Sequence, residues 1–199
     1  MLDGPIRRHI HEPLDRIGVG LEKLGLTPNQ MTGIGFVIGV GACVFVATGR
    51  WYIGLGMWLL NRIVDGLDGP LARRVGPTEL GGFFDIMADF AIYGGIVLAI
   101  GFHVPEARVA ALVLFLMYYL NGSGFLAWSS IAERLQQHDS ERTFHFPTSL
   151  AEGTETIVVM SLILLIGSFT AEILWIWSAA VAISVVQRIF YVRRSLMDS

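Results

Sequence analysis

Long apolar runs alternate with short polar breaks along the whole chain. Six runs can be marked, and most of them reach the roughly 20 residues that a helix needs to cross a membrane. They lie at about 29–49, 51–73, 80–102, 106–131, 148–169 and 171–192. No break between them is long enough to hold a second domain. The pattern therefore predicts one all-α integral membrane domain of six transmembrane helices over residues 26–199.

The first 25 residues follow a different pattern. Apolar residues recur at helical spacing from Ile6 to Leu24, with charged residues elsewhere around the helix. This pattern predicts an amphipathic helix over residues 1–25 that lies at the cytoplasmic membrane interface. The alternative is an ordinary helix that packs on its own protein. Thr27 as N-cap and Pro28 at the first helical position then begin the first span.

Composition and charge agree with a membrane protein. Hydrophobic residues make up 53% of the 199 residues and charged residues only 16%, against about 25% charged in a typical soluble domain. The net charge of −3 and the lack of a basic stripe argue against nucleic-acid binding. The single cysteine, Cys43, can form no intramolecular disulfide and is interpreted as a packing residue.

The distribution of basic residues predicts the orientation. With both termini on one side, that side collects most of the Lys and Arg residues, among them Arg7, Arg73 and Arg194, whereas the opposite side keeps Arg50 and Arg108. The positive-inside rule places the richer side in the cytoplasm. We therefore expect both termini to be cytoplasmic.

Four aspartates stand inside these apolar runs. Asp65 and Asp68 are three residues apart, and Asp85 and Asp89 are four apart, so each pair shares one helix face. A short turn joins the two helices, which brings the pairs to a similar depth near the cytoplasmic end. An unpaired carboxylate costs at least about 2.5 kcal/mol inside hydrocarbon, whereas hard divalent cations prefer oxygen ligands. The pattern predicts a site for one or two divalent cations.

Glycines and arginines flank the aspartates. Gly69 and Gly81 let two helices pack closely, or equally let a ligand approach the backbone. Arg73, one turn beyond Gly69, can reach phosphate oxygens that such a metal also bridges, whereas Arg74 is interpreted as an orientation charge at the membrane surface.

At these positions the sequence resembles the CDP-alcohol phosphatidyltransferase family, and its small bacterial integral-membrane members in particular. The family signature reads D-x2-D-G-x2-A-R, then seven or eight residues, then G-x3-D-x3-D. All eight fixed positions are present, as Asp65, Asp68, Gly69, Ala72, Arg73, Gly81, Asp85 and Asp89. The resemblance extends to the N-terminal helix and the six-span layout, and so covers most of the chain.

The resemblance implies a reaction and a set of site residues. A hydroxyl attacks a CDP-linked substrate, most often CDP-diacylglycerol, and CMP leaves, with two divalent ions (Mg²⁺ or Mn²⁺) as cofactors. Asp65, Asp68 and Asp85 would hold the metals together with Asp89, which would also act as the general base. The CDP pocket would be lined by Pro28, Asn29, Gly69, Ala72, Arg73, Thr78 and Gly81. A homodimer in the bacterial inner membrane, with its site facing the cytoplasm, is the family expectation.

The acceptor alcohol stays open. Glu152 and Glu155, near the start of the fifth run, could hold a cationic head group, as in the CDP-choline or CDP-ethanolamine branch that transfers to diacylglycerol. Arg134 and Arg188, at predicted cytoplasmic helix ends, could instead hold a phosphorylated polyol. Each of these residues could also serve only the bundle, as an internal ion pair or as a positive-inside anchor.

Other functions can use the same aspartates. An intramembrane prenyltransferase also carries two aspartate-rich motifs, but on helices far apart in sequence, whereas here both motifs lie between Asp65 and Asp89. A cation transporter would need a route to the outer face and broken helices near mid-membrane, which are not obvious. A degenerate scaffold disagrees with the intact motif.

Overall fold

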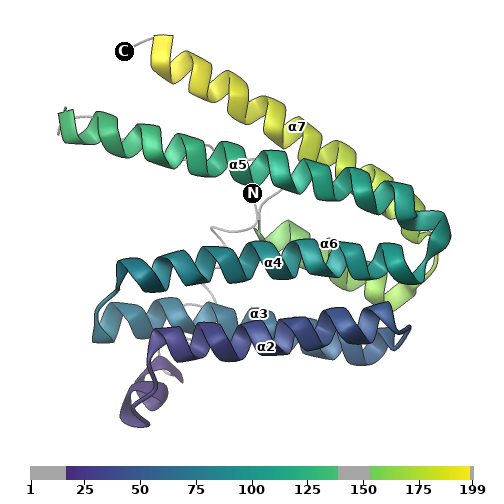
Figure 1. The fold of residues 1–199 in the computed structure, drawn as a ribbon, viewed down its shortest axis with the longest axis horizontal. Helices are drawn as coiled ribbons and strands as arrows, with labels where there is room; N and C mark the ends of the chain where they lie inside the picture. The colour runs from purple at the N-terminus through teal and green to yellow at the C-terminus, as the bar shows by residue number, and fades with distance from the viewer. Residues whose placement is uncertain (1–16, 139–152, 198–199) are drawn as a thin grey trace.

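The protein is an assembly of helices, seen in a computed structural model that describes residues 17–138 and 153–197 (Figure 1). After a short helix at residues 17–23, the elements are α2 (Pro28–Ala47), α3 (Trp51–Val75), α4 (Glu79–His103), η1 (Pro105–Ala107), α5 (Arg108–His138), α6 (Gly153–Ile166) and α7 (Thr170–Met197). Each of the six apolar runs corresponds to one of the helices α2 to α7. The helix assignments are therefore confirmed, with shifts of a few residues at most ends.

Several helices are long and apolar enough to cross a membrane. By length and composition, the described residues contain four such helices: α2, α4, α7 and the stretch Pro105–Leu135. Helix α6, with 14 residues, is apolar but shorter, and α3 carries the charged residues of the motif. A helical membrane protein is thus confirmed. The crossing of α3 and α6, and the cytoplasmic position of both termini, stay predictions.

Local sequence explains where the first helices begin. Thr27 forms the predicted N-cap of α2: its side chain accepts from the backbone N–H of Gln30, whose side chain in turn accepts from the N–H of Thr27. This reciprocal capping box satisfies two of the free N–H groups at the helix start. Thr78 caps α4 in the same way by accepting from the N–H of Gly81.

The turn between α3 and α4 is only three residues long. Helix α3 ends at Gly76, whose φ of 100° lies in a region that favours glycine. Thr78 at the other end of the turn is already the N-cap of α4. Across this short turn α3 and α4 run antiparallel, and their motif-bearing ends lie on the same side (Figure 1). The turn thus brings the two halves of the aspartate motif together.

The hydrophobic core lies toward the opposite ends of the helices. Helix α2 packs on α3 and α4, α4 packs on α5, α5 packs on α7, and α3 packs on α6. Trp51, at the start of α3, contacts the His103 ring at 5.8 Å, so the turns before α3 and after α4 lie together. The fully buried large side chains of this core include Trp58, Ile92, Ile96, Ile100, Leu114, Met160, Ile163, Leu164 and Leu174.

The N-terminal segment packs on the motif-bearing end of α3. Glu22 forms a 3.0 Å ion pair with Arg74, and Leu21 joins a small cluster around Leu67 and Leu71. The helix at residues 17–23 therefore contacts its own protein. The remainder of the predicted amphipathic helix, residues 1–16, lies outside the described residues, and its place at the membrane interface stays a prediction.

Candidate active site

Three of the four motif aspartates form a compact group of oxygen ligands. Asp65 and Asp68 extend from α3 and Asp85 from α4, and one carboxylate oxygen of each lies within 4.8 Å of the others. All three residues are half-buried. Three carboxylates at this spacing, on two helices fixed by one short turn, fit a hard divalent cation. The donor set suits Mg²⁺ or Mn²⁺ and does not suit a thiolate-preferring metal.

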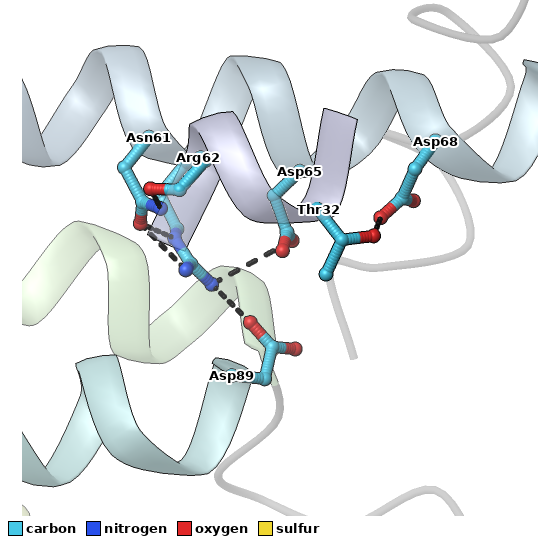
Figure 2. A network of polar contacts seen from close by, with 7 residues as sticks. Thr32, Asn61, Arg62, Asp65, Asp68 and Asp89 are labelled. Carbon is cyan, nitrogen blue, oxygen red and sulfur yellow. Dashed lines mark hydrogen bonds and ion pairs between the residues drawn. The ribbon is translucent and has the colours of Figure 1, made fainter. Parts of the chain in front are cut away.

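Asp68 is oriented by a neighbour that the sequence pattern did not reveal. The hydroxyl of Thr32, on α2, lies within hydrogen-bond distance of two acceptors, Asp68 Oδ2 at 3.1 Å (Figure 2) and the carbonyl of Pro28 at 3.2 Å. Thr32 is buried. Such a partner behind a metal-binding carboxylate fixes its direction and tunes its affinity for the ion.

Asp89 lies beside this group and pairs with an arginine. Its Oδ1 accepts a hydrogen bond of 2.7 Å from Nη1 of Arg62, and the same nitrogen lies 3.7 Å from Asp65 Oδ2 (Figure 2). Among the described residues, the group that could hold an ion comprises only Asp65, Asp68 and Asp85. The role of Asp89 as a further metal ligand and as a base stays a prediction.

The Arg62 guanidinium is itself firmly placed. Its Nε and Nη2 both donate to Asn61 Oδ1, at 2.8 and 2.6 Å, and it lies near the faces of Trp58 and Tyr93, at 5.1 and 4.6 Å from the ring centroids. The buried Asn61 amide donates to the Gly35 carbonyl at 2.8 Å. The signal in the sequence was present: Arg62 is the only basic residue between Arg50 and Arg73, and it lies three residues before Asp65.

A pocket of about 480 Å³ opens beside the carboxylates between α2, α3 and α4. Asp68 and Asp85 form part of its wall. Six of the seven predicted CDP-binding residues also line it, namely Pro28, Asn29, Gly69, Ala72, Thr78 and Gly81. The seventh, Arg73, is not among the lining residues. Its Nη1 lies 3.7 Å from the place that a Cβ on Gly69 would occupy, so the guanidinium lies close to the pocket wall.

Gly81 closes the pocket at the start of α4. A Cβ added there would lie 2.7 Å from Asn29 Oδ1 and 2.8 Å from Thr78 Oγ1, which is closer than real Cβ contacts. Asn29 and Thr78 can therefore approach the helix only because residue 81 has no side chain. Close packing at this motif glycine is thus shown, whereas ligand access stays a prediction.

The described acceptor candidates, Arg134, Glu155 and Arg188, are not among the residues that line this pocket. Arg134 is exposed, and its Nε donates to the Ser130 carbonyl at 3.4 Å. Arg188 is half-buried, with its guanidinium 5.5 Å from the Phe125 ring centroid. Glu155 lies in the first turn of α6, whereas Glu152 lies outside the described residues. Which of the four residues, if any, contacts the acceptor alcohol therefore stays a prediction.

Comparisons with known proteins agree with this geometry. The family model for CDP-alcohol phosphatidyltransferase matches residues 25–187. The "Inner membrane protein YnjF" of Escherichia coli (strain K12) is 38% identical over 166 residues, which cover 81% of each chain. An "Archaetidylinositol phosphate synthase" of Pyrococcus horikoshii is 39% identical over 99 residues, which cover 47% of this chain and 52% of that one.

Solved structures of one enzyme share the fold. The phosphatidylinositol phosphate synthase PgsA1 of Mycobacterium tuberculosis with CDP-DAG bound superposes with a TM-score of 0.71 at 19% identity, covering 89% of this chain and 92% of that one. The same enzyme in complex with manganese and citrate gives 0.71 at 20% identity, covering 89% and 87%. The family model over residues 25–187 and the 38% identical E. coli relative, together with the intact eight-residue motif, show that the chain belongs to the CDP-alcohol phosphatidyltransferase family and is a membrane-bound transferase of phospholipid biosynthesis.

Proposed function

We propose that the protein transfers a phosphatidyl group from CDP-diacylglycerol to the hydroxyl of a small alcohol. The hydroxyl oxygen forms a new bond to the lipid-linked phosphorus, the bond from that phosphorus to the CMP oxygen breaks, and CMP leaves. The product is a phosphodiester lipid. The lipid chains stay in the bilayer, and the alcohol arrives from the aqueous side.

One observation carries this proposal. Asp68 and Asp85 belong both to the group of three carboxylates and to the wall of the 480 Å³ pocket. A diphosphate in the pocket would therefore lie against the cation-binding oxygens, with the nucleoside beside Gly69, Ala72 and Gly81. A divalent cation bound there would stabilise the negative charge that develops on the leaving phosphate.

The remaining motif residues receive complementary roles. Asp89 lies at the edge of the carboxylate group and accepts the proton of the attacking hydroxyl, as a general base that shares the site with the ion. Arg73, next to the Gly69 wall, contacts phosphate oxygens of the donor. Asn29 and Thr78, which both lie close to Gly81, contact the nucleoside.

The acceptor is proposed to be a phosphorylated polyol. The name of the Pyrococcus horikoshii relative and the fold shared with the Mycobacterium tuberculosis synthase both point to inositol phosphate chemistry, and the proposed donor has the same chemistry as the CDP-DAG in that structure. Arg188 and Arg134 are the proposed phosphate contacts. The amine acceptor with Glu152 and Glu155 is the competing hypothesis.

CMP release by purified protein in detergent tests the reaction. CDP-diacylglycerol is offered with Mg²⁺ or Mn²⁺ and with inositol phosphate, glycerol 3-phosphate or serine, and CDP-choline and CDP-ethanolamine are offered with diacylglycerol. We expect release with CDP-diacylglycerol and a phosphorylated polyol, and none with Asp89→Asn. Release only with a CDP-alcohol would replace the proposed donor. No metal-dependent CDP binding, with metal uptake into proteoliposomes instead, would favour a cation transporter.

We also propose that the protein works in the bacterial inner membrane as a homodimer, with the pocket facing the cytoplasm. The E. coli relative's name and the excess of basic residues on the pocket side support this location. Labelling of single cysteines introduced in the turn at residues 76–78 and in the turn at 48–50 tests the orientation. In intact cells, a membrane-impermeant reagent should modify only the second turn. Mass measurement in detergent tests the dimer.

A further inference from the structure

We propose that Arg74 is a positioning residue for the pocket beside the carboxylates: paired with Glu22, it holds the helix at residues 17–23 against α3 and so fixes two walls of the pocket. The inference rests on the proposed function, in which this pocket holds the CDP part of the donor. It gives Arg74, directly after the motif arginine, a task beyond that of an orientation charge at the membrane surface.

The last turns of α3 present two faces with different partners. The residues of one face line the pocket at helical spacing: Gly69, Ala72, Val75 and Gly76. The residues of the other face meet the helix at residues 17–23: Pro70, Leu71 and Arg74. A contact on this second face therefore sets where the pocket-lining face lies.

Pro70 makes this end of α3 dependent on support from outside the helix. A proline has no N–H to donate to the carbonyl four residues before it, which here belongs to Gly66. The helix thus lacks one of its own bonds where the pocket wall begins, at Gly69. Contacts with a neighbouring segment can supply the rigidity that this bond does not.

The helix at residues 17–23 provides such contacts. Gly18 is buried, and a Cβ on it would lie 3.5 Å from Pro70 Cβ, so the two segments are in close contact. Leu21 packs on the small apolar cluster described above. Glu22 Oε2 accepts a hydrogen bond of 3.0 Å from Arg74 Nε, which adds an ion pair at the solvent-exposed edge of the contact.

The same segment leads directly into a second wall of the pocket. Gly25 adopts a φ of 71°, and the N–H of Leu26 donates to the Leu21 carbonyl at 3.2 Å, which closes a tight turn after the helix. Residues 27–29 follow at once, begin α2 and line the pocket. The helix at residues 17–23 contacts one wall and is continuous with another, so its position sets how the two walls are placed.

This arrangement predicts which quantities respond to a loosened contact. Asp65 and Asp68 precede Pro70 on α3, and Asp85 lies on α4, so the carboxylates are not part of the contact. Loss of the contact should weaken binding of the donor and of CDP, while kcat and Mn²⁺ affinity change little. A residue that served only membrane orientation would change none of these quantities in purified, folded protein.

The first test is a charge exchange in detergent-purified protein. KM and kcat for CDP-diacylglycerol are measured by CMP release, and the dissociation constant of CDP by calorimetric titration with Mn²⁺ present. Glu22→Arg and Arg74→Glu should each raise KM and the CDP dissociation constant about three- to fivefold, the range for an exposed ion pair. The double variant Glu22→Arg/Arg74→Glu should return both to within about twofold of wild type. Lys23→Glu, an exposed charge change on the same helix, is the control and should alter neither.

A second test separates the two segments by size. Gly18→Leu does not fit against Pro70 and should raise the CDP dissociation constant about tenfold, whereas Gly20→Leu, where a Cβ meets nothing within 4 Å, should leave it unchanged. Equal effects of these two variants, unchanged binding in both single charge variants, or no rescue in the double variant would overturn the proposal. If the wild-type protein bound CDP but released no CMP from any pair, the proposed function would fail, and the CDP titrations would still decide the role of Arg74.

Discussion

The two ends of the helices are built in opposite ways. At the packed end, around the turns 48–50, 104–107 and 167–169, helices α2 to α7 all contribute to one large buried core. At the site end, the cluster of buried apolar residues around the motif aspartates comprises, within the described ranges, Met31, Leu67 and Leu71. In Figure 1, α5 and α7 diverge from α2, α3 and α4 toward the site end. The packed end fixes the helices, and the site end leaves room for a substrate.

Glycines on α3 show the same contrast within one helix. A Cβ on Gly54, at the packed end, would lie 2.5 Å from Val46 Cγ2 and 3.3 Å from the Ala42 carbonyl oxygen. A Cβ on Gly69, at the site end, would meet only the Arg73 side chain at 3.7 Å. Gly54 therefore allows α3 to pack closely on α2, whereas Gly69 leaves space in the pocket that a larger side chain would fill. Stability and chemistry should accordingly respond to different residues, which the following predictions test.

Removing a metal-binding carboxylate should have the largest effect. In Asp85→Asn we expect CMP release to fall at least about 100-fold, because one charged oxygen ligand is lost from the group of three. Mn²⁺ binding should weaken in parallel, while thermal unfolding in detergent changes little. Glu106→Gln, an exposed acidic change at the packed end, is the control. Full activity in Asp85→Asn would remove this group from the mechanism.

A cavity in the packed end should affect stability instead. Ile96 is fully buried on α4, two turns beyond Asp89, and Ile96→Ala should lower the free energy of unfolding by about 2–5 kcal/mol. Mn²⁺ affinity of the folded protein should stay near that of wild type. Ile176→Ala, at a position 71% exposed, should cost less than about 0.5 kcal/mol. If Ile96→Ala also abolished Mn²⁺ binding, the two ends would not be separable.

The helices and the carboxylate group could both be predicted from the sequence. The apolar runs predicted α2 to α7 because length and hydropathy leave few other structures for them. The convergence of Asp65, Asp68 and Asp85 followed from helical spacing and a short turn. The three-residue turn places α3 against α4 directly, so this convergence could be predicted without knowing how the other helices pack.

The supporting residues could not be derived in the same way. Thr32 and Asn61 act across α2 and α3, and the rotation of α2 against α3 depends on packing along the whole helix pair. Arg62 was visible as a basic residue inside an apolar run, but its partner Asp89 lies 27 residues away on another helix. The acceptor residues Arg134 and Arg188 belong to α5 and α7, whose relation to the site no local motif specifies.

A methyl group at the pocket wall should have a moderate effect on substrate binding. In Gly81→Ala the new Cβ would displace Asn29 or Thr78, which it would otherwise approach to 2.7 and 2.8 Å. We expect KM for CDP-diacylglycerol to rise about tenfold, which corresponds to roughly 1.4 kcal/mol, with Mn²⁺ affinity unchanged. Gly56→Ala on α3, where a Cβ meets nothing within 4 Å, should leave KM unchanged. An unaltered KM in Gly81→Ala would mean that the nucleoside does not use this wall.

The smallest effect, on Mn²⁺ affinity, is expected from Thr32, which contacts the carboxylate of Asp68. Thr32→Val keeps the shape of the side chain and removes the hydroxyl that donates to Asp68 at 3.1 Å. Partners of metal ligands typically contribute about 10-fold or more to metal affinity, but Asp68 is one of three proposed ligands, and all three are only half-buried. We therefore expect Mn²⁺ binding to weaken by about three- to tenfold in electron paramagnetic resonance titrations.

Thr48→Val is the matched control, because Thr48 lies at the packed end of the same helix and bonds only to carbonyls of its own helix. Equal losses in both variants would assign the effect to α2 itself. A loss confined to Thr32→Val would show that the site end is tuned by single hydrogen bonds, whereas the packed end depends on shared apolar contact.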